Sequence, residues 1–470
     1  MKEQNIKLEE FEKYIENKKV AIIGLGVSNI PLIDYLHNNN AQVSIFDERN
    51  LAQIKEKVNK EILENIEKYN FTFITGKKCL EYLKNFDIIF RSPSCLPTRK
   101  ELVKEQEKGT IITTEIEMLI KLAPCKIIGI TGSDGKTTTT SLIYEILSKS
   151  GRNTYLGGNI GLPLFTKLNE IKKDDIIVLE LSSFQLMGMD ISPDIAVITN
   201  ISPNHLNIHK DYEEYIQSKK NIFKYQDESG IVVLNYDNDI TRNMKKEANG
   251  KVIYFSGTQK LEDGYILDDN IIKKCDDGVR KHILDCKEVL LRGKHNYENI
   301  ETALATTESL VSIEKAIQYV KNFKAVEHRL EYIRELDGVK WYNDSVSSSP
   351  TRAIAGLKSF EEEIVLIAGG YDKNLDYTPI AKPIVDKVKV LILIGQTSKK
   401  IEECVKLECI KQNRKIEIYK CELLEDTVKI AKQKSKPNQV VLFSPASASF
   451  DMFKDFADRG IKFKELVNKI

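Results

Sequence analysis

The chain has 470 residues, of which 41% are hydrophobic, and this is enough material for the cores of about three globular domains. Its 70 lysine and arginine residues balance 69 aspartate and glutamate residues, so no overall field favours nucleic acid or an acidic membrane surface. Eight scattered cysteines without a Cys-x-x-Cys pair argue against a zinc ribbon or a disulfide framework and indicate a reducing compartment.

The N-terminal segment, residues 1–19, is charged and lacks the apolar core of a secretory signal. No apolar run approaches the length of a transmembrane helix. We therefore expect a soluble, cytoplasmic and monomeric protein that neither binds nucleic acid nor inserts into a membrane.

The N-terminal part of the chain alternates between short apolar runs and helical patterns. Such alternation is typical of a parallel sheet covered by helices. The runs that predict strands are Val20–Ile23, Val43–Phe46, Phe71–Ile74 and Asp87–Phe90.

The turn after the first predicted strand, Gly24-Leu25-Gly26-Val27-Ser28-Asn29, resembles a dinucleotide-binding fingerprint that lacks its third glycine. Asp47 ends the next strand, near where a ribose-binding acid would lie. Arg49 and the turn Ser92-Pro93-Ser94 follow other strands at the same edge, although each alone could be a solvated loop. The pattern leaves an NAD site open and favours some phosphate-bearing or nucleotide-like ligand above this sheet.

A second α/β unit starts near Thr113 and contains a glycine-rich loop. An apolar run that begins at Lys126 predicts a strand, Gly132-Ser133-Asp134-Gly135 a turn, and Lys136-Thr137-Thr138 the start of a helix. Unpaired N–H groups at a helix N-terminus and the helix dipole both favour phosphate. Lys136 adds a positive charge for the β- and γ-phosphates, and the Thr137 hydroxyl is a ligand for Mg²⁺.

The spacing of this loop departs from the strict G-x-x-x-x-G-K-[ST] pattern. Ile130 stands where the first glycine belongs, and Gly129 precedes it by one residue. Because a strand and a helix flank the loop, a chance Gly-Lys-Thr is a poor explanation. We therefore predict an ATP site.

Further strands of this unit are predicted at Ile176–Leu179, Ile195–Thr199 and Ile231–Leu234. Residues 250–292 contain short apolar runs, turns and many charges, which we interpret as a small antiparallel insert. A helix that opens at Asn296 closes the unit.

Two side chains follow these strands where Mg²⁺ ligands are expected. Glu180 comes directly after the strand Ile176–Leu179, and His205 follows the strand Ile195–Thr199. Ligands of open parallel sheets bind at the carboxyl ends of the strands, and a carboxylate there suits the Mg²⁺ that bridges nucleotide phosphates. Either residue alone could be a solvated surface group, so their alignment with Lys136 at one edge is what favours a site.

A lysine, Lys219, lies in the middle of an apolar helical stripe, whereas Lys220 turns away from it. The stripe comprises Tyr212, Tyr215, Ile216, Ile222 and Phe223. Such a lysine commonly extends its amine out of the core. The alternative is that burial lowers its pKa and leaves a neutral amine, which can add CO₂ and become a metal-binding carbamate.

A second glycine-rich loop, Gly157-Gly158-Asn159-Ile160-Gly161, lies between the ATP loop and Glu180 in the sequence. Glycines alone indicate a turn. Asn159 could contact a phosphate, a substrate amide or Mg²⁺.

The third unit begins near Val326. Its predicted strands are Ile364–Ile367, Val390–Ile394, Ile416–Ile418 and Val440–Phe443. Polar turns follow three strands, at Asn343-Asp344-Ser345, at Gly369-Gly370 with Lys373, and at Ser444–Ser449, and the last is expected to enter a helix over Phe450–Val467. Structural turns would explain each of them, but three at one strand edge favour a small anionic ligand, which the N–H groups of the helix could bind.

Together these patterns predict an α/β fold of three domains in series. We expect a Rossmann-like N-terminal domain at residues 1–113, a central P-loop mononucleotide-binding domain at 114–325 and a Rossmann-like C-terminal domain at 326–470.

Several segments, in this order, resemble the Mur ligase family over essentially the whole chain. They are Gly132-Ser-Asp-Gly-Lys-Thr-Thr138, Gly158-Asn-Ile-Gly161, Leu179-Glu-Leu-Ser-Ser-Phe-Gln-Leu186, Lys294-His-Asn-Tyr-Glu-Asn299, Glu327-His-Arg329 and Ser444-Pro-Ala-Ser-Ala-Ser449. The Ser-Ser-Phe-Gln segment is similar to the branch of the family that adds D-glutamate.

This resemblance implies an ATP-dependent ligase that joins D-glutamate to UDP-N-acetylmuramoyl-L-alanine through an acyl phosphate during peptidoglycan precursor synthesis. It implies substrate contacts at Ser28, Arg49, Ser92, Ser94 and Asn159, and a D-glutamate pocket at Ser348, Lys373, Ser449 and Phe456. It implies ATP contacts at Gly132, Ser133, Asp134, Gly135, Lys136, Thr137, Thr138, Asn296, Asn299, Arg329 and Asp344. It implies catalytic roles for Lys136, Glu180, His205 and Lys219, with two Mg²⁺ ions held by Thr137, Glu180, His205 and a CO₂-derived carbamate on Lys219.

The chain departs from the family pattern at three positions. Asp134 stands where asparagine is usual, which places a carboxylate beside the expected ATP phosphates. Val346 follows Asn343-Asp344-Ser345 where the family commonly has lysine, and Ser348 stands where threonine is common. These departures leave details of the pockets open.

Other functions remain compatible with the sequence. One is a related amide ligase that adds meso-diaminopimelate or L-lysine, or a folate polyglutamate synthetase, each of which needs only a different C-terminal pocket. A non-catalytic ATP-binding switch and a dehydrogenase that uses the first domain are further alternatives.

Overall fold

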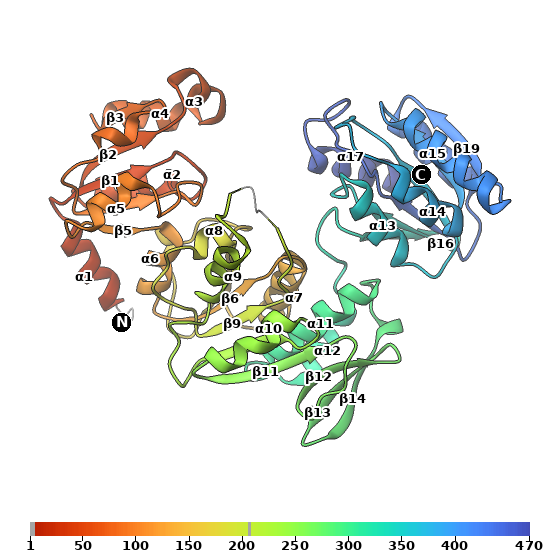
Figure 1. Cartoon of the computed structure of the whole chain (residues 1–470), viewed down its shortest axis with the longest axis horizontal. Helices are drawn as coiled ribbons and strands as arrows, with labels where there is room; N and C mark the ends of the chain where they lie inside the picture. The colour runs from red at the N-terminus through yellow and green to blue at the C-terminus, as the bar shows by residue number, and fades with distance from the viewer. Residues whose placement is uncertain (1–4, 205–207) are drawn as a thin grey trace. The chain divides into compact units, whose positions relative to one another are not determined.

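The computed structural model describes residues 5–204 and 208–470. The chain forms two compact units. One comprises residues 1–268, 273–283 and 299–316, and the other comprises residues 269–272, 284–298 and 317–470. Three sheets carry the fold, and Figure 1 labels many of their strands and helices.

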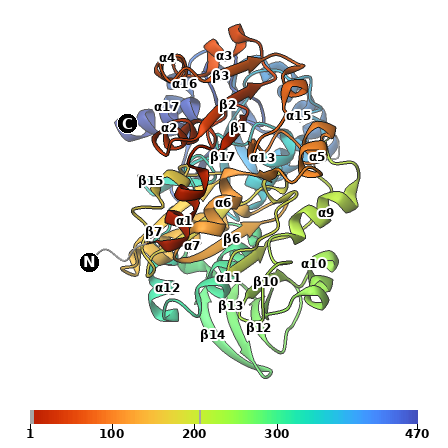
Figure 2. The same ribbon diagram turned by 90° about the vertical axis from the view of Figure 1, so that its left-hand side faces the viewer.

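The first sheet has five parallel strands in the order β3-β2-β1-β4-β5. Figure 2 shows three of these strands, β3, β2 and β1, one after another. The strands are β1 (Lys19–Ile23), β2 (Gln42–Asp47), β3 (Thr72–Thr75), β4 (Ile88–Arg91) and β5 (Ile111–Thr113), and the helices are α1 (Ile6–Ile15), α2 (Ile30–Asn38), α3 (Leu51–Lys57), α4 (Lys60–Lys68) and α5 (Lys100–Gln106). All four predicted strands are therefore confirmed, whereas β5 was not predicted because its three residues are too short for a periodic signal.

The second sheet has nine strands in the order β14-β13-β12-β11-β10-β9-β6-β8-β7. The strands are β6 (Lys126–Thr131), β7 (Thr154–Gly158), β8 (Ile176–Glu180), β9 (Ile195–Ile198), β10 (Ile231–Asn235), β11 (Lys251–Ser256), β12 (Gly264–Asp268), β13 (Ile271–Asp276) and β14 (Val279–Asp285). The helices of this part are α6 (Glu115–Leu122), α7 (Lys136–Lys149), α8 (Ser183–Leu186), α9 (Tyr212–Lys220), α10 (Asp239–Asn243), α11 (Lys294–Thr307) and α12 (Ile313–Lys321).

The prediction that residues 250–292 form a small antiparallel insert was wrong for the first two strands of this segment, β11 and β12. β11 pairs in parallel with β10, and β12 pairs in parallel with β11, so these strands extend the main sheet. Hairpin geometry begins only beyond β12, where two-residue turns with positive φ, at Asp269-Asn270 and Asp277-Gly278, connect β12 to β13 and β13 to β14. Charged residues on the exposed strand faces hid the continuation of the sheet from the sequence pattern.

The third sheet has the order β15-β16-β20-β17-β18-β19, and only β15 runs antiparallel to its neighbour. Its strands are β15 (Glu331–Leu336), β16 (Val339–Asn343), β17 (Ile364–Ala368), β18 (Val388–Ile394), β19 (Glu417–Cys421) and β20 (Val440–Phe443). Its helices are α13 (Pro350–Lys358), α14 (Thr378–Lys387), α15 (Ser398–Gln412), α16 (Leu424–Lys434) and α17 (Phe456–Lys469).

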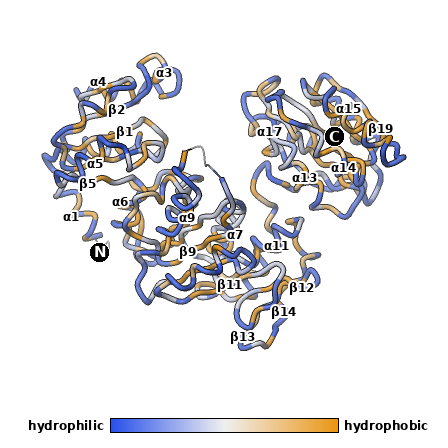
Figure 3. Tube along the Cα trace, viewed as in Figure 1, coloured by the Kyte–Doolittle hydropathy of each residue, from blue (hydrophilic) through white to orange (hydrophobic). Residues whose placement is uncertain are grey.

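Alternate residues of these strands face two separate cores. Leu366 and Leu391 pack with the helices α13 to α15 on one face, whereas Val365 and Ile392 pack with α16 and α17 on the other. This is the period of two that a strand imposes, and because both faces are covered the strands are apolar throughout. Figure 3 shows hydrophobic colour along β9, an inner strand of the second sheet whose residues are likewise all buried.

Two further expectations on element bounds were wrong. The predicted loop Gly157–Gly161 begins within a strand, because Gly157 and Gly158 end β7. The helix predicted over Phe450–Val467 starts only at Phe456, where the Asp455 side chain accepts a hydrogen bond from the backbone of Asp458. The Asp455 cap sets the start of the helix although the apolar periodicity begins further upstream, so Ser449 does not lie at the helix N-terminus.

In the part of the chain that the structure describes, no helix is both long and apolar enough to cross a membrane. All eight cysteines are free thiols.

Candidate active site

The glycine-rich loop between β6 and α7 has the conformation of a phosphate cradle. Gly132 (φ +148°) and Gly135 (φ +79°) adopt backbone angles that favour glycine, and Gly135 is the N-cap of α7. A Cβ on Gly132 would lie 1.9 Å from Thr199 Oγ1, and one on Gly135 would lie 2.5 Å from Asn299 Oδ1. Glycine at these two positions lets Thr199 and Asn299 pack against the loop at the start of α7, where backbone N–H groups favour an anion.

Lys136 folds back over this loop. Its Nζ donates hydrogen bonds to the carbonyl oxygens of Gly132 (2.9 Å) and Ser133 (3.0 Å). Asp134 is exposed, and its backbone N–H donates to Asn200 Oδ1 (3.0 Å). The Asp134 carboxylate is thus at the surface of the loop, where water can solvate it.

Lys219 is buried, with only 2% of its surface exposed, so of the two alternatives that the apolar stripe of α9 left open, the structure shows the buried amine. Its Nζ donates to Thr131 Oγ1 (3.1 Å) and to the Gly132 carbonyl (2.9 Å), and it lies 4.8 Å from the ring centre of Tyr215. Burial lowers the pKa of Lys219 to about 7, and the positive charge of Lys136 adds to this effect, whereas Glu180 opposes it. A large share of this amine is therefore neutral near physiological pH.

Glu180 ends β8 and has one oxygen available for a further ligand. Its side chain is buried, and Oε1 accepts a hydrogen bond from Asn159 Nδ2 (2.8 Å). Oε2 is buried and has no hydrogen-bond partner among the described residues. An orphaned buried carboxylate oxygen is costly unless a cation or donor satisfies it, so Glu180 fits the role of a Mg²⁺ ligand.

The remaining metal ligands cannot all be placed. His205 lies outside the described residues. Within residues 5–204 and 208–470, no group of three or more His, Cys, Asp and Glu side chains could hold a metal ion. A complete site would therefore need a ligand such as His205 or a modified Lys219.

The short helix α8 forms a second wall of the site. Ser182 and Gln185 form a reciprocal capping box, which sets the path of the Ser-Ser-Phe-Gln segment. Phe184 stacks on His209 with ring centres 5.0 Å apart, and the Ser183 hydroxyl lies 2.9 Å from His209 Nε2. The sequence analysis did not single out His209, and its only signal was a second histidine four residues after His205.

These walls enclose a cavity of about 660 Å³. Besides Gly132 of the phosphate loop, its lining brings together five residues predicted from the sequence to serve the site, namely Ser28, Ser94, Lys136, Asn159 and Lys219. Two of these come from turns of the first sheet and three from the second, so the cavity lies between the carboxyl edges of both sheets.

Arg49 belongs to a separate cluster at the edge of the first sheet. Its guanidinium binds the Asp47 carboxylate (2.7 Å), which also accepts a hydrogen bond from the Leu25 N–H (2.9 Å). Burial favours a raised pKa for Asp47, but these hydrogen bonds outweigh it and lower the pKa. The Asp47 carboxylate is already paired within the protein, which disfavours its use as the ribose ligand of an NAD site. The Ser92 and Ser94 hydroxyls, which lie 3.0 Å apart, follow β4.

The residues expected to contact the nucleotide fall in both units. Asn299 accepts a hydrogen bond from Thr139 (3.2 Å) and lies against the phosphate loop. Asn296, Arg329 and Asp344 belong to the other unit. Asp344 is buried, and its Oδ2 accepts a hydrogen bond from the Ser444 hydroxyl (2.7 Å). Burial raises the pKa of Asp344 to about 6.

The residues of the predicted D-glutamate pocket follow adjacent strands of the third sheet. Ser348 comes after β16, Ser449 after β20 and Lys373 after β17, and Phe456 starts α17. Because these three strands are parallel neighbours, their carboxyl ends share one edge, where ligands of such sheets bind. Lys373 lies 5.3 Å from the ring centre of Phe450.

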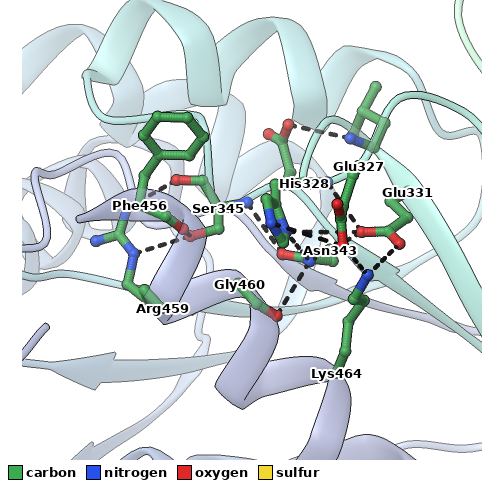
Figure 4. A network of polar contacts seen from close by, with 11 residues as sticks. Glu327, His328, Glu331, Asn343, Ser345, Phe456, Arg459, Gly460 and Lys464 are labelled. Carbon is green, nitrogen blue, oxygen red and sulfur yellow. Dashed lines mark hydrogen bonds and ion pairs between the residues drawn. The ribbon is translucent and has the colours of Figure 1, made fainter. Parts of the chain in front are cut away.

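A buried arginine that the sequence analysis missed connects these loops (Figure 4). Arg459 donates to the Ser345 hydroxyl (3.0 Å) and carbonyl (2.8 Å), and to the carbonyls of Ser447 (3.1 Å) and Ala448 (3.0 Å). The Ser345 hydroxyl donates in turn to the Phe456 carbonyl (2.7 Å). Burial lowers the pKa of Arg459 to about 10, so the guanidinium stays charged.

Comparison with known proteins agrees with this architecture. The Mur ligase MurD-like N-terminal domain matches residues 18–114, the Mur ligase middle domain matches residues 130–307, and the Mur ligase glutamate ligase domain matches residues 328–447. The chain is 46% identical to the UDP-N-acetylmuramoylalanine--D-glutamate ligase of Acetivibrio thermocellus, over 99% of both chains. It is also 46% identical to the protein of that name from Clostridium botulinum, over 98% of both chains.

Solved structures share the fold at low sequence identity. The UDP-N-acetylmuramate-alanine ligase MurC of Thermotoga maritima aligns with a TM-score of 0.57 and 18% identity, covering 96% of this chain and 99% of that one. The MurF ligase of the same organism, solved in complex with ADP, aligns with a TM-score of 0.53 and 19% identity, covering 97% and 96%. The three domain matches, and relatives 46% identical over nearly the full length of the chain, show that the chain belongs to the Mur ligase family.

Proposed function

We propose that the protein is an ATP-dependent ligase that adds D-glutamate to UDP-N-acetylmuramoyl-L-alanine in peptidoglycan precursor synthesis, releasing ADP and phosphate. The observation that carries the proposal is the cavity that joins Lys136 and Lys219 to Asn159, to the Ser-Ser-Phe-Gln wall and to the turns of the first sheet. The full-length relatives named for this reaction support the choice of substrates.

The chemistry follows from the charges of the reactants. A carboxylate oxygen of UDP-N-acetylmuramoyl-L-alanine attacks the γ-phosphorus of ATP, and the bond from that phosphorus to ADP breaks. Two anions must meet in this step, so the N–H groups at the start of α7 and the Lys136 ammonium are needed to offset their repulsion. The amine of D-glutamate then attacks the acyl carbon, and phosphate leaves with the carbon–oxygen bond electrons.

Thr137 and Glu180 would hold one Mg²⁺, and His205 with a modified Lys219 would hold a second. When bound, Mg²⁺ supplies charge neutralisation for the phosphates. The orphaned Glu180 Oε2 fits this assignment. The oxygen lies at the end of β8, and β8 is the immediate sheet neighbour of β6, from which the phosphate loop starts.

Lys219 suits carbamylation because it is a buried amine of low pKa. The ammonium would first lose one proton, and the neutral nitrogen would then bond to the carbon of CO₂ and release a second, so that a cation becomes an anion with two oxygens. The exchange would also replace repulsion between Lys219 and Lys136 by attraction, since both lysines bind the Gly132 carbonyl in the unmodified protein.

The second unit contains all four residues that the family resemblance assigns to D-glutamate and three of those that it assigns to the nucleotide. We assign Ser348, Lys373, Ser449 and Phe456 to D-glutamate. Asn296, Asn299, Arg329 and Asp344 are assigned to the nucleotide. The domain bounds 1–113, 114–325 and 326–470, the monomeric state and the cytoplasmic location remain predictions. Asp134 and Val346 would modify the nucleotide and amino acid pockets without changing the reaction.

Phosphate release from ATP tests the proposal and separates it from its rivals. The assay combines UDP-N-acetylmuramoyl-L-alanine and ATP with D-glutamate, meso-diaminopimelate, L-lysine or L-glutamate, one at a time. Release with D-glutamate alone is expected. Release with another amino acid would indicate a related ligase, no release with any would favour an ATP-binding switch, and a change in NAD(P)H absorbance would favour a dehydrogenase.

A further inference from the structure

Arg91 is a buried cation at the junction of the first and second sheets, and no role in the reaction has been assigned to it above. It ends β4, in register with Ile23 of β1, and only 2% of its surface is exposed. Its guanidinium binds main-chain carbonyls rather than a carboxylate. Burying a charge in this way is costly unless its hydrogen bonds are well made, so the position of this group is tightly defined.

The two carbonyls that Arg91 binds belong to opposite walls of the cavity. One is the carbonyl of Cys95 (3.2 Å), in the turn that contains Ser92 and Ser94. The other is the carbonyl of Met187, at the end of α8. Pro93, Ser94 and Leu96 line the cavity from the first wall, and residues 182–185 line it from the second.

Close packing and a second hydrogen bond extend this connection toward the phosphate loop. Gly188 (φ +79°) packs against Pro97, where a Cβ would lie 3.1 Å from two atoms of the proline ring. The carbonyl of Leu186, the last residue of α8, accepts a hydrogen bond from Asn221 Nδ2 (2.9 Å), and Asn221 is the C-cap of α9, the helix that carries Lys219. The Ser92–Leu96 turn, α8 and α9 thus form one continuous series of contacts.

We propose that Arg91 is a positioning residue for the sugar-nucleotide substrate, because it fixes the separation between the Ser92–Leu96 turn and the end of α8. A ligand that spans this cavity contacts both walls, and a wall that moves by a fraction of an ångström changes the fit of such a ligand. The proposal rests on the function proposed above, since it assumes that the ligand between these walls is the UDP-linked substrate.

The test compares Arg91→Lys and Arg91→Met with the wild type in the D-glutamate-dependent phosphate release assay. We expect KM for UDP-N-acetylmuramoyl-L-alanine to rise about tenfold in Arg91→Lys, because a lysine amine cannot bind both carbonyls as the guanidinium does. The rise should be larger in Arg91→Met, because methionine donates no hydrogen bond to either carbonyl. KM for D-glutamate should stay within about twofold, because its predicted pocket follows strands of the third sheet, and KM for ATP should rise less than KM for the sugar nucleotide, because Arg91 binds neither the phosphate loop nor α7. Arg152→Lys is the control, since Arg152 also donates to a carbonyl, that of Leu310 (3.1 Å), but is exposed and does not line the cavity.

A purely structural role would lower the thermal midpoint of Arg91→Lys and leave KM for the sugar nucleotide unchanged, which would overturn the proposal. An equal rise in all three KM values would overturn it as well. If Arg91→Met does not fold, the Arg91→Lys values decide alone. An inactive wild type would refute the proposed function itself, and UDP binding measured by the shift of the thermal midpoint would still test Arg91 by comparison with Arg152→Lys.

Discussion

Replacing Lys219 by methionine should make the protein more stable at neutral pH and abolish its activity. Methionine has nearly the length of the lysine stem but carries no charge, so it fills the buried space without an ammonium. The stabilisation is expected because the native site disfavours the charged form of Lys219, as its pKa of about 7 indicates.

The size of this effect follows from the shift. Each pKa unit corresponds to about 1.4 kcal/mol, so a fall from 10.5 to about 7 amounts to at most about 5 kcal/mol of destabilisation when the amine is charged. The substitution also removes two hydrogen bonds, each worth about 1 kcal/mol. Their acceptors keep other partners, since Gly132 retains Lys136 and the Thr131 hydroxyl binds the Leu181 carbonyl (2.7 Å). A net gain of about 3 kcal/mol is therefore expected at pH 7 and below.

The pH dependence has a definite sign. Between pH 7 and 10.5 the unfolded chain holds a proton on Lys219 that the folded chain does not, so the stability of the wild type rises with pH in this window. The advantage of Lys219→Met should be complete below pH 7 and should disappear as the pH approaches 10. Urea unfolding in CO₂-depleted buffer from pH 6 to 10 measures this difference.

Lys220→Met is the matched control. Lys220 is the next residue of α9, and its amine pairs with Glu247 (2.7 Å), whose side chain is half exposed. Such a pair contributes about 0–1 kcal/mol, and the variant should keep wild-type activity. A Lys219→Met protein whose stability relative to wild type does not change between pH 7 and 10 would refute the buried-amine argument. Full activity of Lys219→Ala would refute the carbamate role, for which inactivity with partial rescue by a short carboxylic acid is expected.

Three further substitutions test the site. Gly135→Ala should raise KM for ATP at least about tenfold, because the new Cβ would strain a positive φ and collide with Asn299. Gly109 has a similar φ of +95° but no atom near its Cβ position, so Gly109→Ala is a control for the strain alone. Glu180→Gln keeps the shape but loses the charge, and should lower kcat by about 100-fold and shift the Mg²⁺ titration to higher concentration. Arg459→Lys should raise KM for D-glutamate about tenfold and leave KM for ATP unchanged, since it connects the loops of the expected amino acid pocket; equal effects on both substrates would contradict this role.

Local patterns were sufficient for the strands and for the chemistry that lies next to them. The apolar runs before Gly132, Glu180 and Asp344 fixed where β6, β8 and β16 end, and the carboxyl ends of parallel strands must share an edge. The place of Lys219 in an apolar stripe also needed only the helical period, because neighbours at three and four positions share a face, whereas the structure decided that its amine is buried.

Sequence reasoning failed where the partner of a residue is distant in the chain. The charged runs at residues 250–285 are typical of an exposed insert, but β11 pairs with the edge of β10 and so extends the main sheet. The sequence pattern does not show that this edge is available. Arg91 and Arg459 each appear as ordinary charged residues, and their burial becomes visible only when Met187, 96 residues away, and Ser345, 114 residues away, supply the carbonyls.

The sequence by itself determined the α/β class and the strand, glycine-rich turn and helix of the phosphate loop, because these depend on residue type and on periods of two and 3.6 residues. Only the tertiary structure decided which edges face one cavity, which carboxylate oxygen has no partner and which arginines hold the walls. The reason is that buried polar and charged groups form hydrogen bonds with the donors and acceptors that folding brings near them, and these need not be neighbours in the chain.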